Sequence, residues 1–237
     1  MNSVFSLLSF STLILYSNTL SVPKCKLSDS ECLKSSANAF LPTIVDVTKE
    51  LNSEPIDPMM VDKIIVNLSG LNFVMNDVAI TGLGEVKIQK LSVDTEKKQM
   101  RLLFESNNLL KGKYKASGQL LILPIVGDGD FTIDIKNSLT DILINFDIIK
   151  NSDGKDVMNL KSFTYTNEIR DGCKIRLTKL FNGNKELSDA LHKFMDDNWK
   201  LVSQEFGRPI LDTTNKILFK VIKKYLKSQP LEDITLP

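Results

Sequence analysis

The sequence predicts an α+β fold in which a strongly curved antiparallel β-sheet wraps around a long C-terminal α-helix, with a further helix near the N-terminus. Two observations lead to this fold class. Apolar residues alternate with period two from about Met60 to Phe181, and they return to helical spacing from Lys185 to Lys227. A long helix with a broad apolar face must bury that face against a partner of similar length. The alternating segment is the available partner, which favours a sheet wrapped around the helix.

The predicted strands follow one another without intervening helices. The segments "MRLLF", "FTIDI", "ILINFDI" and "SFTYT" each place their apolar residues on one side, as half-buried strands do. Short turns between successive strands imply antiparallel neighbours. We expect these turns where turn-forming residues gather: Gly82-Leu83-Gly84, Asn107-Asn108, Gly127-Asp128-Gly129, residues 151–154 and Asp171-Gly172.

Helical segments precede and follow the predicted sheet. The stretch from Leu33 to Leu51 has helical spacing, and Pro42 inside it is expected to kink or divide the helix. The C-terminal segment contains residues 207–209, Gly-Arg-Pro, where we expect the chain to bend. If it is helical throughout, this segment is roughly 60 Å long, at about 1.5 Å per residue.

The N-terminal segment predicts secretion. Residues 1–21 carry no charged side chain and hold an apolar run of the length typical of a signal peptide, too short to span a bilayer. Small residues suit cleavage after Ser21, and cleavage after Ser17 or Thr19 is an alternative. We therefore expect a signal peptide at residues 1–21, one domain at residues 22–237, an extracellular location and no stable membrane insertion.

Composition excludes some functions. The 237 residues are 42% hydrophobic, enough to bury a sizeable core. Lys and Arg number 30 against 29 Asp and Glu, for a net charge of +1. Nucleic-acid binding proteins normally show a basic excess or a basic stripe. The balanced charge therefore argues against nucleic acid as a partner.

The cysteines fit an oxidising compartment. Cys25 and Cys32 lie close together just after the predicted cleavage site, and we expect them to form a disulfide. Cys173 is left over, either as a buried free thiol or in an intermolecular disulfide. The spacing of the cysteines and the single histidine matches no zinc site.

The search for catalytic groups finds no candidate constellation. His192 is the single histidine, and a hydrolase would need it beside a nucleophile, but no Gly-x-Ser-x-Gly elbow is present. No phosphate-binding glycine loop leads into a helix. The Gly-Asp-Gly-Asp stretch from Gly127 lacks the further oxygen ligands of a calcium loop and is expected to be a turn. We therefore predict no enzyme activity, no metal and no cofactor. Asn67 begins the sequon Asn-Leu-Ser, a possible N-glycosylation site.

Five sequence motifs, in order, carry a resemblance. They are the early cysteine pair, "DVAITGL" (77–83), "GKYKASGQLLILPIVGDGDF" (112–131), "LTKLFNGNKELSDALHKFMDDNWKLV" (177–202) and the closing "PLEDITLP" (230–237). With them the chain resembles the insect takeout/juvenile hormone-binding protein family over nearly all of its mature length. The resemblance implies a tubular lipid-binding fold and a secreted carrier of a hydrophobic small molecule, with circadian or feeding-related roles. The hormone-binding branch is associated with a second disulfide, which Cys173 cannot form here, so the resemblance favours the takeout-like branch.

The leading hypothesis is therefore a monomeric, non-enzymatic carrier that holds a juvenile hormone-like terpenoid, a fatty acid or another lipophile in an internal apolar tunnel. The alternative is an extracellular interaction or signalling protein with a filled core and no ligand. A tunnel between helix and sheet has two walls, so its lining should come from both. The predicted lining residues are Phe104, Phe131, Ile133, Ile144, Phe146, Phe163 and Tyr165 from the strands, and Leu191, Met195, Trp199 and Val202 from the helix.

Overall fold

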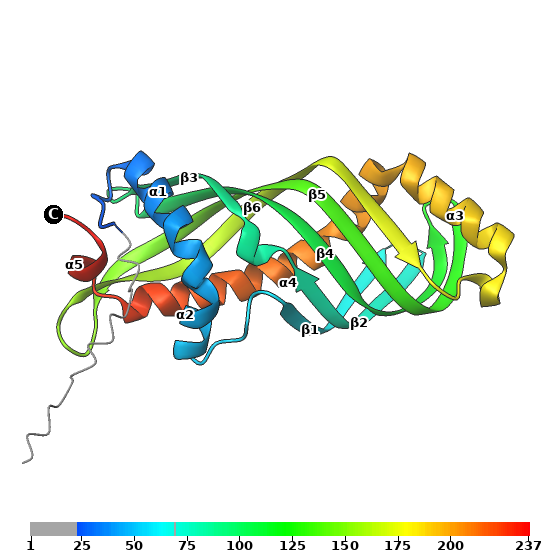
Figure 1. The fold of residues 1–237 in the computed structure, drawn as a ribbon, viewed down its shortest axis with the longest axis horizontal. Helices are drawn as coiled ribbons and strands as arrows, with labels where there is room; N and C mark the ends of the chain where they lie inside the picture. Colours follow the sequence, from blue (N-terminus) through cyan, green and yellow to red (C-terminus); the bar gives the residue numbers. More distant parts are fainter. Residues whose placement is uncertain (1–22, 69) are drawn as a thin grey trace, which may run out of the picture.

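The computed structural model describes residues 23–68 and 70–237, so the predicted signal peptide at residues 1–21 lies outside the described residues. The predicted fold class is confirmed: a long antiparallel sheet curves around the C-terminal helix, and the N-terminal helical segment lies against one end (Figure 1). The strands are β1 (Met59–Leu68), β2 (Leu71–Thr81), β3 (Lys87–Asp94), β4 (Gln99–Leu120), β5 (Leu123–Lys150) and β6 (Asp156–Leu177). The helices are α1 (Ser30–Phe40), α2 (Ile44–Glu50), α3 (Lys185–Asp197), α4 (Trp199–Ser228) and α5 (Leu231–Ile234).

The sheet is built on three very long strands. Its order is β1-β2-β4-β5-β6, and every neighbouring pair is antiparallel. β3 pairs with β4 beyond the end of β2, so these two strands follow each other along one edge of β4. β4, β5 and β6 contain 22, 28 and 22 residues. They cross most of the length of the molecule and join its two ends (Figure 1). The turn predicted at residues 151–154 connects β5 to β6.

Two of the predicted turns are bulges inside long strands, so the prediction was wrong there. Asn107-Asn108 lies within β4 and Asp171-Gly172 within β6, next to a third bulge at Asn137 in β5. Asn107 Oδ1 accepts a hydrogen bond from the backbone N–H of Asn137 at 2.8 Å, and Asn137 Nδ2 donates to Asp171 Oδ2 at 3.0 Å. A bulge bends a strand without ending it. The three linked bulges therefore form a line across the sheet at which the strands bend.

The Gly-Asp-Gly-Asp stretch is also part of a strand and not a turn, which corrects the prediction. It lies within β5, and the real turn is at residues 121–122. A side chain at Gly127 would place its Cβ 2.4 Å from the Tyr114 hydroxyl, and one at Gly129 would meet the Thr178 carbonyl oxygen at 2.6 Å. The Tyr114 hydroxyl donates a 2.7 Å hydrogen bond to the Thr178 carbonyl oxygen. Burial raises the pKa of this hydroxyl to about 12. The glycines therefore make room for a buried tyrosine.

The helical segments divide at one expected place and one unexpected place. Pro42 separates α1 from α2, as predicted. The C-terminal segment divides at Asn198 into α3 and α4, which was not predicted, and residues 207–209, where a bend was predicted, lie inside α4. The side chains on either side of Pro209, Phe206 and Ile210, are buried in the core. Their packing holds the helix against the sheet and outweighs the hydrogen bond that the proline removes.

Two hydrophobic clusters fill the space between the sheet and the helices. The larger cluster contains buried side chains of α2, β1, β2 and α3, and of residues 202–221 of α4. It also contains buried side chains from those parts of β4, β5 and β6 that lie at the α3 end of the molecule. The smaller cluster contains Met100, Phe104, Ile142, Ile144, Phe146, Met158 and Leu160, with partly buried side chains of β3 and of the C-terminal part of α4 packed against it. The smaller cluster lies on the other side of the line of bulges.

Candidate ligand cavity

A cavity of about 230 Å³ lies between the smaller cluster, the C-terminal part of α4 and the α1–α2 segment. Its wall consists of Ala37, Phe40, Leu41, Ile44, Ile56, Leu83, Val86, Ile88, Leu91, Met100, Leu102, Phe104, Ile142, Ile144, Phe163, Asn215, Leu218, Phe219, Val221, Ile222, Tyr225 and Leu226. Asn215 and Tyr225 are the wall residues with polar side-chain atoms. An apolar cavity of roughly 150 Å³ in another protein stays dry and binds benzene. The cavity described here is large enough for a bigger apolar molecule.

Several apolar wall residues are only partly buried although they face the interior. Leu102, Phe163, Phe219, Ile222 and Leu226 all retain intermediate exposure and pack against the smaller cluster. In a close-packed core such side chains would be covered by their neighbours. Part of the surface of these side chains therefore remains uncovered by other protein atoms.

The wall follows α4 along one face. Asn215, Leu218, Ile222 and Leu226 recur at spacings of three and four, so they share one face of the helix. The 11 steps from Asn215 to Leu226 correspond to about 16 Å of helix at about 1.5 Å per residue. The cavity is therefore elongated along the helix axis.

The α1–α2 segment covers the cavity and is tied to the end of the chain. The predicted disulfide joins Cys25 to Cys32 of α1. Cys25 also accepts a backbone hydrogen bond from Leu236 at 2.9 Å. On the cavity side, the rings of Phe40 and Tyr225 lie 4.9 Å apart between centroids. The disulfide therefore fixes the beginning of α1 to the C-terminal segment, while Phe40 holds the far end of α1 against α4.

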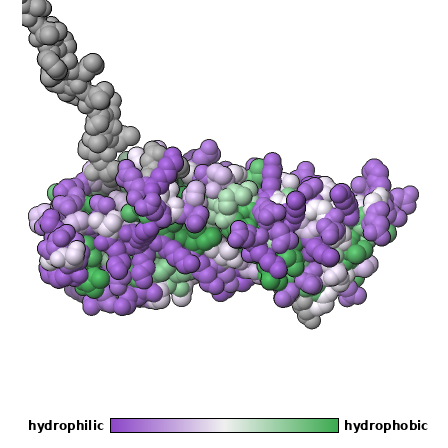
Figure 2. Space-filling model, turned by 90° about the horizontal axis from the view of Figure 1, so that it is seen from below, coloured by the Kyte–Doolittle hydropathy of each residue, from purple (hydrophilic) through white to green (hydrophobic). Residues whose placement is uncertain are grey.

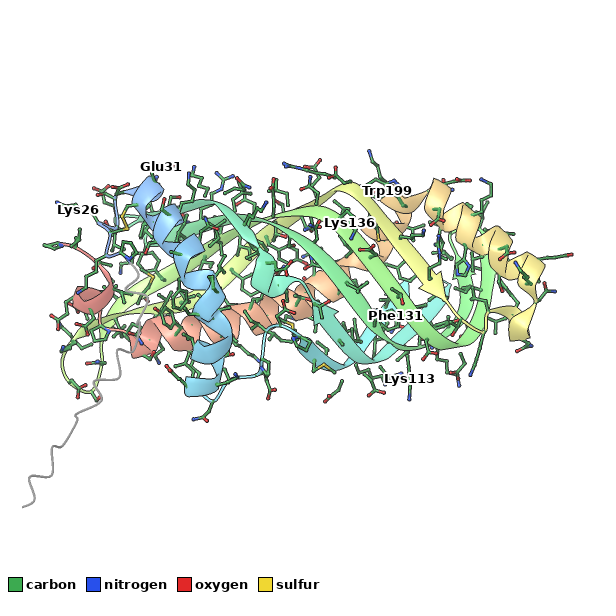
Figure 3. The ribbon with its side chains drawn as sticks, in the orientation of Figure 1. Lys26, Glu31, Lys113, Phe131, Lys136 and Trp199 are labelled. Carbon is green, nitrogen blue, oxygen red and sulfur yellow. A yellow bond between two sulfur atoms is a disulfide. The ribbon has the colours of Figure 1, made fainter. Side chains whose placement is uncertain are left out.

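The structure divides the predicted lining residues between the two clusters. Phe104, Ile144 and Phe163 lie on the cavity wall, and Phe146 belongs to the smaller cluster without reaching the wall. The larger cluster contains Phe131, Ile133, Leu191, Met195 and Val202, with Trp199 packed against it. Figure 3 shows Phe131 and Trp199 in the half of the molecule away from α1. The cavity wall therefore brings together three of the eleven predicted positions.

Tyr165 connects the sheet to α4 outside the cavity wall. Its hydroxyl donates a 2.6 Å hydrogen bond to Asp212 Oδ1, and the guanidinium of Arg208 lies 5.2 Å from its ring centroid. Burial and the neighbouring Asp212 raise the pKa of the Tyr165 hydroxyl well above its ordinary value. The side chain therefore serves as a polar tie between β6 and α4.

A band of polar side chains separates the two clusters on the inner face of the sheet. We call Ser106, Asn108, Ser138, Thr140 and Asn167 the polar band. Asn167 Nδ2 donates to Ser138 Oγ and to Thr140 Oγ1, both at 2.8 Å, and Asn108 Nδ2 donates to Ser106 Oγ at 2.8 Å. The polar band was not predicted from the sequence. The sequence does contain a sign of it, because the inward-facing residues of β4 are apolar at Leu102 and Phe104 and polar at Ser106 and Asn108.

The corresponding stretch of α4 is polar as well. Thr214 and Asn215 are buried between Ile210 of the larger cluster and Phe219, which packs against the smaller one. The Thr214 hydroxyl donates to the Ile210 carbonyl oxygen at 2.9 Å. Asn215 is 3% exposed, and its Nδ2 has no hydrogen-bond partner among the described residues. Asn215 thus brings an unsatisfied donor to the cavity wall.

The titratable groups named by the sequence are engaged in structural contacts. The backbone N–H of Leu177 donates to His192 Nε2 at 3.1 Å. Burial, with a contribution from Arg176, lowers the pKa of His192, which keeps the imidazole neutral. Cys173 is a buried free thiol, and burial raises its pKa to about 11, so it stays protonated. Within residues 23–68 and 70–237, no group of three or more His, Cys, Asp or Glu side chains could hold a metal ion.

The face of the molecule drawn in Figure 2 is largely hydrophilic. Figure 2 shows one face on which hydrophobic side chains form separate patches between hydrophilic ones. Asn67, the candidate glycosylation site, is exposed on β1. None of the described helices combines the length and the apolar composition needed to cross a bilayer.

Comparisons with known proteins cover almost the whole chain. The sequence profile described as "Haemolymph juvenile hormone binding protein (JHBP)" matches residues 4–236. The crystal structure of Epiphyas postvittana Takeout 1 is similar with a TM-score of 0.88 and 36% sequence identity, over 90% of this chain and 99% of that chain. The circadian clock-controlled protein daywake of Drosophila melanogaster is 26% identical over 222 residues, and that of Drosophila yakuba is 25% identical. Each alignment spans 89% of this chain and 85% of the relative.

Proposed function

Because the chain belongs to the haemolymph juvenile hormone binding protein family, we propose that it is a secreted, non-enzymatic carrier of a hydrophobic small molecule. The ligand lies in the cavity between α4, the sheet and the α1–α2 segment. Suitable ligands are elongated lipophiles, such as a terpenoid or a fatty acyl compound. Two relatives are named circadian clock-controlled proteins, so the proposal includes control of this protein by the circadian clock.

The observation that carries the proposal is the elongated apolar cavity. Twenty of its 22 wall residues have purely apolar side chains, so the main driving force is removal of ligand surface from water. A lipophile that buries some 400 Å² would gain on the order of 10 kcal/mol before association costs, at about 25 cal/mol per Å². With association costs of about 4 kcal/mol, the low end of their range, about 6 kcal/mol would remain, which corresponds to a dissociation constant on the order of tens of micromolar.

The test is recovery of ligand from the secreted protein. Protein purified from the medium of insect cells is extracted with organic solvent, and the extract is analysed by mass spectrometry. A second sample is titrated with the apolar fluorophore N-phenylnaphthylamine. We expect a co-purifying lipophile, and saturable fluorophore binding that is displaced by long-chain lipids. A protein that yields no lipophile and shows no saturable binding would instead fit the alternative, an extracellular interaction protein with a filled core.

A further inference from the structure

Asn215 is an unusual residue for an apolar cavity wall. It is 3% exposed, it belongs to the cavity wall, and its Nδ2 is buried without a hydrogen-bond partner among the described residues. A buried donor without a partner is unfavourable, and proteins normally avoid one. The neighbouring Thr214 follows that rule, because its hydroxyl is bonded to Ile210. The Nδ2 atom of Asn215 therefore lacks a partner, and a bound molecule would supply one if the side chain turned toward the cavity.

The surrounding polar groups do not compete for this amide. In the polar band, Asn167 Nδ2 is satisfied by Ser138, Thr140 and the Leu139 carbonyl. Asn108 Oδ1 is the other buried side-chain atom without a partner in the described part of the chain, but Asn108 does not belong to the cavity wall. Asn215 is therefore the cavity-wall residue that carries a buried, unsatisfied side-chain donor in the described part of the chain.

The wall also restricts the charge of the group that can reach Asn215. No lysine, arginine or histidine is among the described wall residues. Burying a carboxylate without a cationic partner is strongly unfavourable, whereas an uncharged carbonyl or ether oxygen needs only a donor. Tyr225, the other wall residue with a polar atom, is ten residues away on α4, or about 15 Å at about 1.5 Å per residue.

Building on the carrier function proposed above, we propose that Asn215 selects lipophiles with an uncharged oxygen acceptor at their inner end. Nδ2 of Asn215 donates a hydrogen bond to an ester, ketone or similar oxygen near the middle of the molecule. The apolar tail extends along α4 toward Tyr225 and α1. The ligand class is a neutral lipophile with one uncharged oxygen-bearing group at its inner end, and neither a free fatty acid nor a pure hydrocarbon meets this condition.

The experiment compares matched competitors on the full secreted protein. Methyl myristate, myristic acid and hexadecane have similar length but carry an uncharged ester, a carboxylate and no oxygen. Each competitor is used to displace N-phenylnaphthylamine from the delipidated wild-type protein and from delipidated Asn215→Leu. For each protein, the dissociation constants of the three competitors are then compared as ratios. Thr214→Val is the matched control, because Thr214 is a buried polar neighbour outside the cavity wall. Asn215→Ala is the second variant, used if Asn215→Leu does not fold.

We expect the wild-type protein to prefer methyl myristate over hexadecane by about five-fold, the equivalent of about 1 kcal/mol for one net hydrogen bond. Asn215→Leu should abolish this preference while hexadecane binding is unchanged or tighter, and Thr214→Val should retain it. Myristic acid should bind more weakly than the ester to the wild-type protein, and its affinity should change little in Asn215→Leu.

Two results would overturn the proposal. One is a preference for the ester that survives in Asn215→Leu and Asn215→Ala. The other is a wild-type protein that binds all three competitors with equal affinity. Either result leaves the carrier function standing, because the lipids still bind. A wild-type protein that binds neither the fluorophore nor any competitor removes the carrier function itself, and the role of Asn215 with it.

Discussion

Enlarging one residue in each cluster distinguishes the cavity wall from the close-packed interior. Ile144 is 1% exposed and lies on the cavity wall, whereas Val202 is 0% exposed and lies in the larger cluster away from the wall. Both were predicted from the sequence to line a tunnel. Replacing each with phenylalanine is therefore expected to have different effects at the two sites.

The magnitudes follow from the surroundings of each residue. Ile144→Phe extends into a cavity of about 230 Å³ and should change the stability of the unliganded protein little. If its ring displaces about two methylene groups of a bound chain, the loss is roughly 1.6 kcal/mol, or about 15-fold in the dissociation constant. Val202 is fully buried in the larger cluster and does not belong to the wall of this cavity, so overpacking by Val202→Phe should cost about 1–3 kcal/mol. For a protein of this size that lowers Tm by roughly 2–12 °C.

The assay measures Tm of the delipidated proteins by circular dichroism and their affinity by displacement of the fluorophore with a long-chain ester. Val202→Phe is the control for the enlargement itself, because the same side chain is introduced at a buried position between the sheet and the helices. The reasoning is refuted if Ile144→Phe lowers Tm as much as Val202→Phe and leaves ligand affinity unchanged. In that case Ile144 belongs to a filled core.

Three other predictions concern stability. Replacing both Cys25 and Cys32 with serine should cost about 2–3 kcal/mol, because the disulfide closes a short loop; a double variant that melts like the wild type would contradict the anchoring role. His192 has a lowered pKa in the folded state, so the unfolded chain takes up its proton first. Stability should fall as pH drops below about 6.5 and level off below the folded pKa. The Tm of His192→Gln should depend less on pH than the Tm of the wild type. An equal pH dependence in both proteins would show that His192 is not its cause. Tyr165→Phe should lose about 1 kcal/mol with its bond to Asp212 and keep the affinity for lipids; a large loss of affinity would place Tyr165 at the ligand.

The sequence was sufficient to predict the fold class because the periodicity of apolar residues changes only twice along the chain. It was not sufficient to locate the ends of the strands. Asn107 and Asp171 are residues that favour turns, yet each occupies a bulge whose hydrogen bonds connect neighbouring strands. Gly127 and Gly129 are also turn residues, but here they accommodate Tyr114 and Thr178. A turn signal and a bulge signal use the same residues, and the distinction depends on the partner strand.

The cavity was harder to place for a different reason. Alternation identifies the side chains that point inward, and it does so equally for Phe104 on the cavity wall and for Phe131 in the larger cluster. Whether an inward side chain meets protein or space depends on how far the sheet lies from the helix. That distance is a property of the assembled fold. The change from apolar to polar inward residues at Ser106 was readable in the sequence, and it marks the inner limit of the cavity.

The continuous strands also bear on cooperativity. Keeping a cavity open in a protein interior costs about 24 cal/mol per Å³. For about 230 Å³ the cost is on the order of 5 kcal/mol, which is comparable with the entire net stability of many domains. The cavity end would therefore be only marginally stable on its own. Because β4, β5 and β6 continue from it into the larger cluster, the packing of that cluster also restrains the parts of these strands that surround the cavity. The packing energy of the filled end thus keeps the hollow end folded before any ligand arrives.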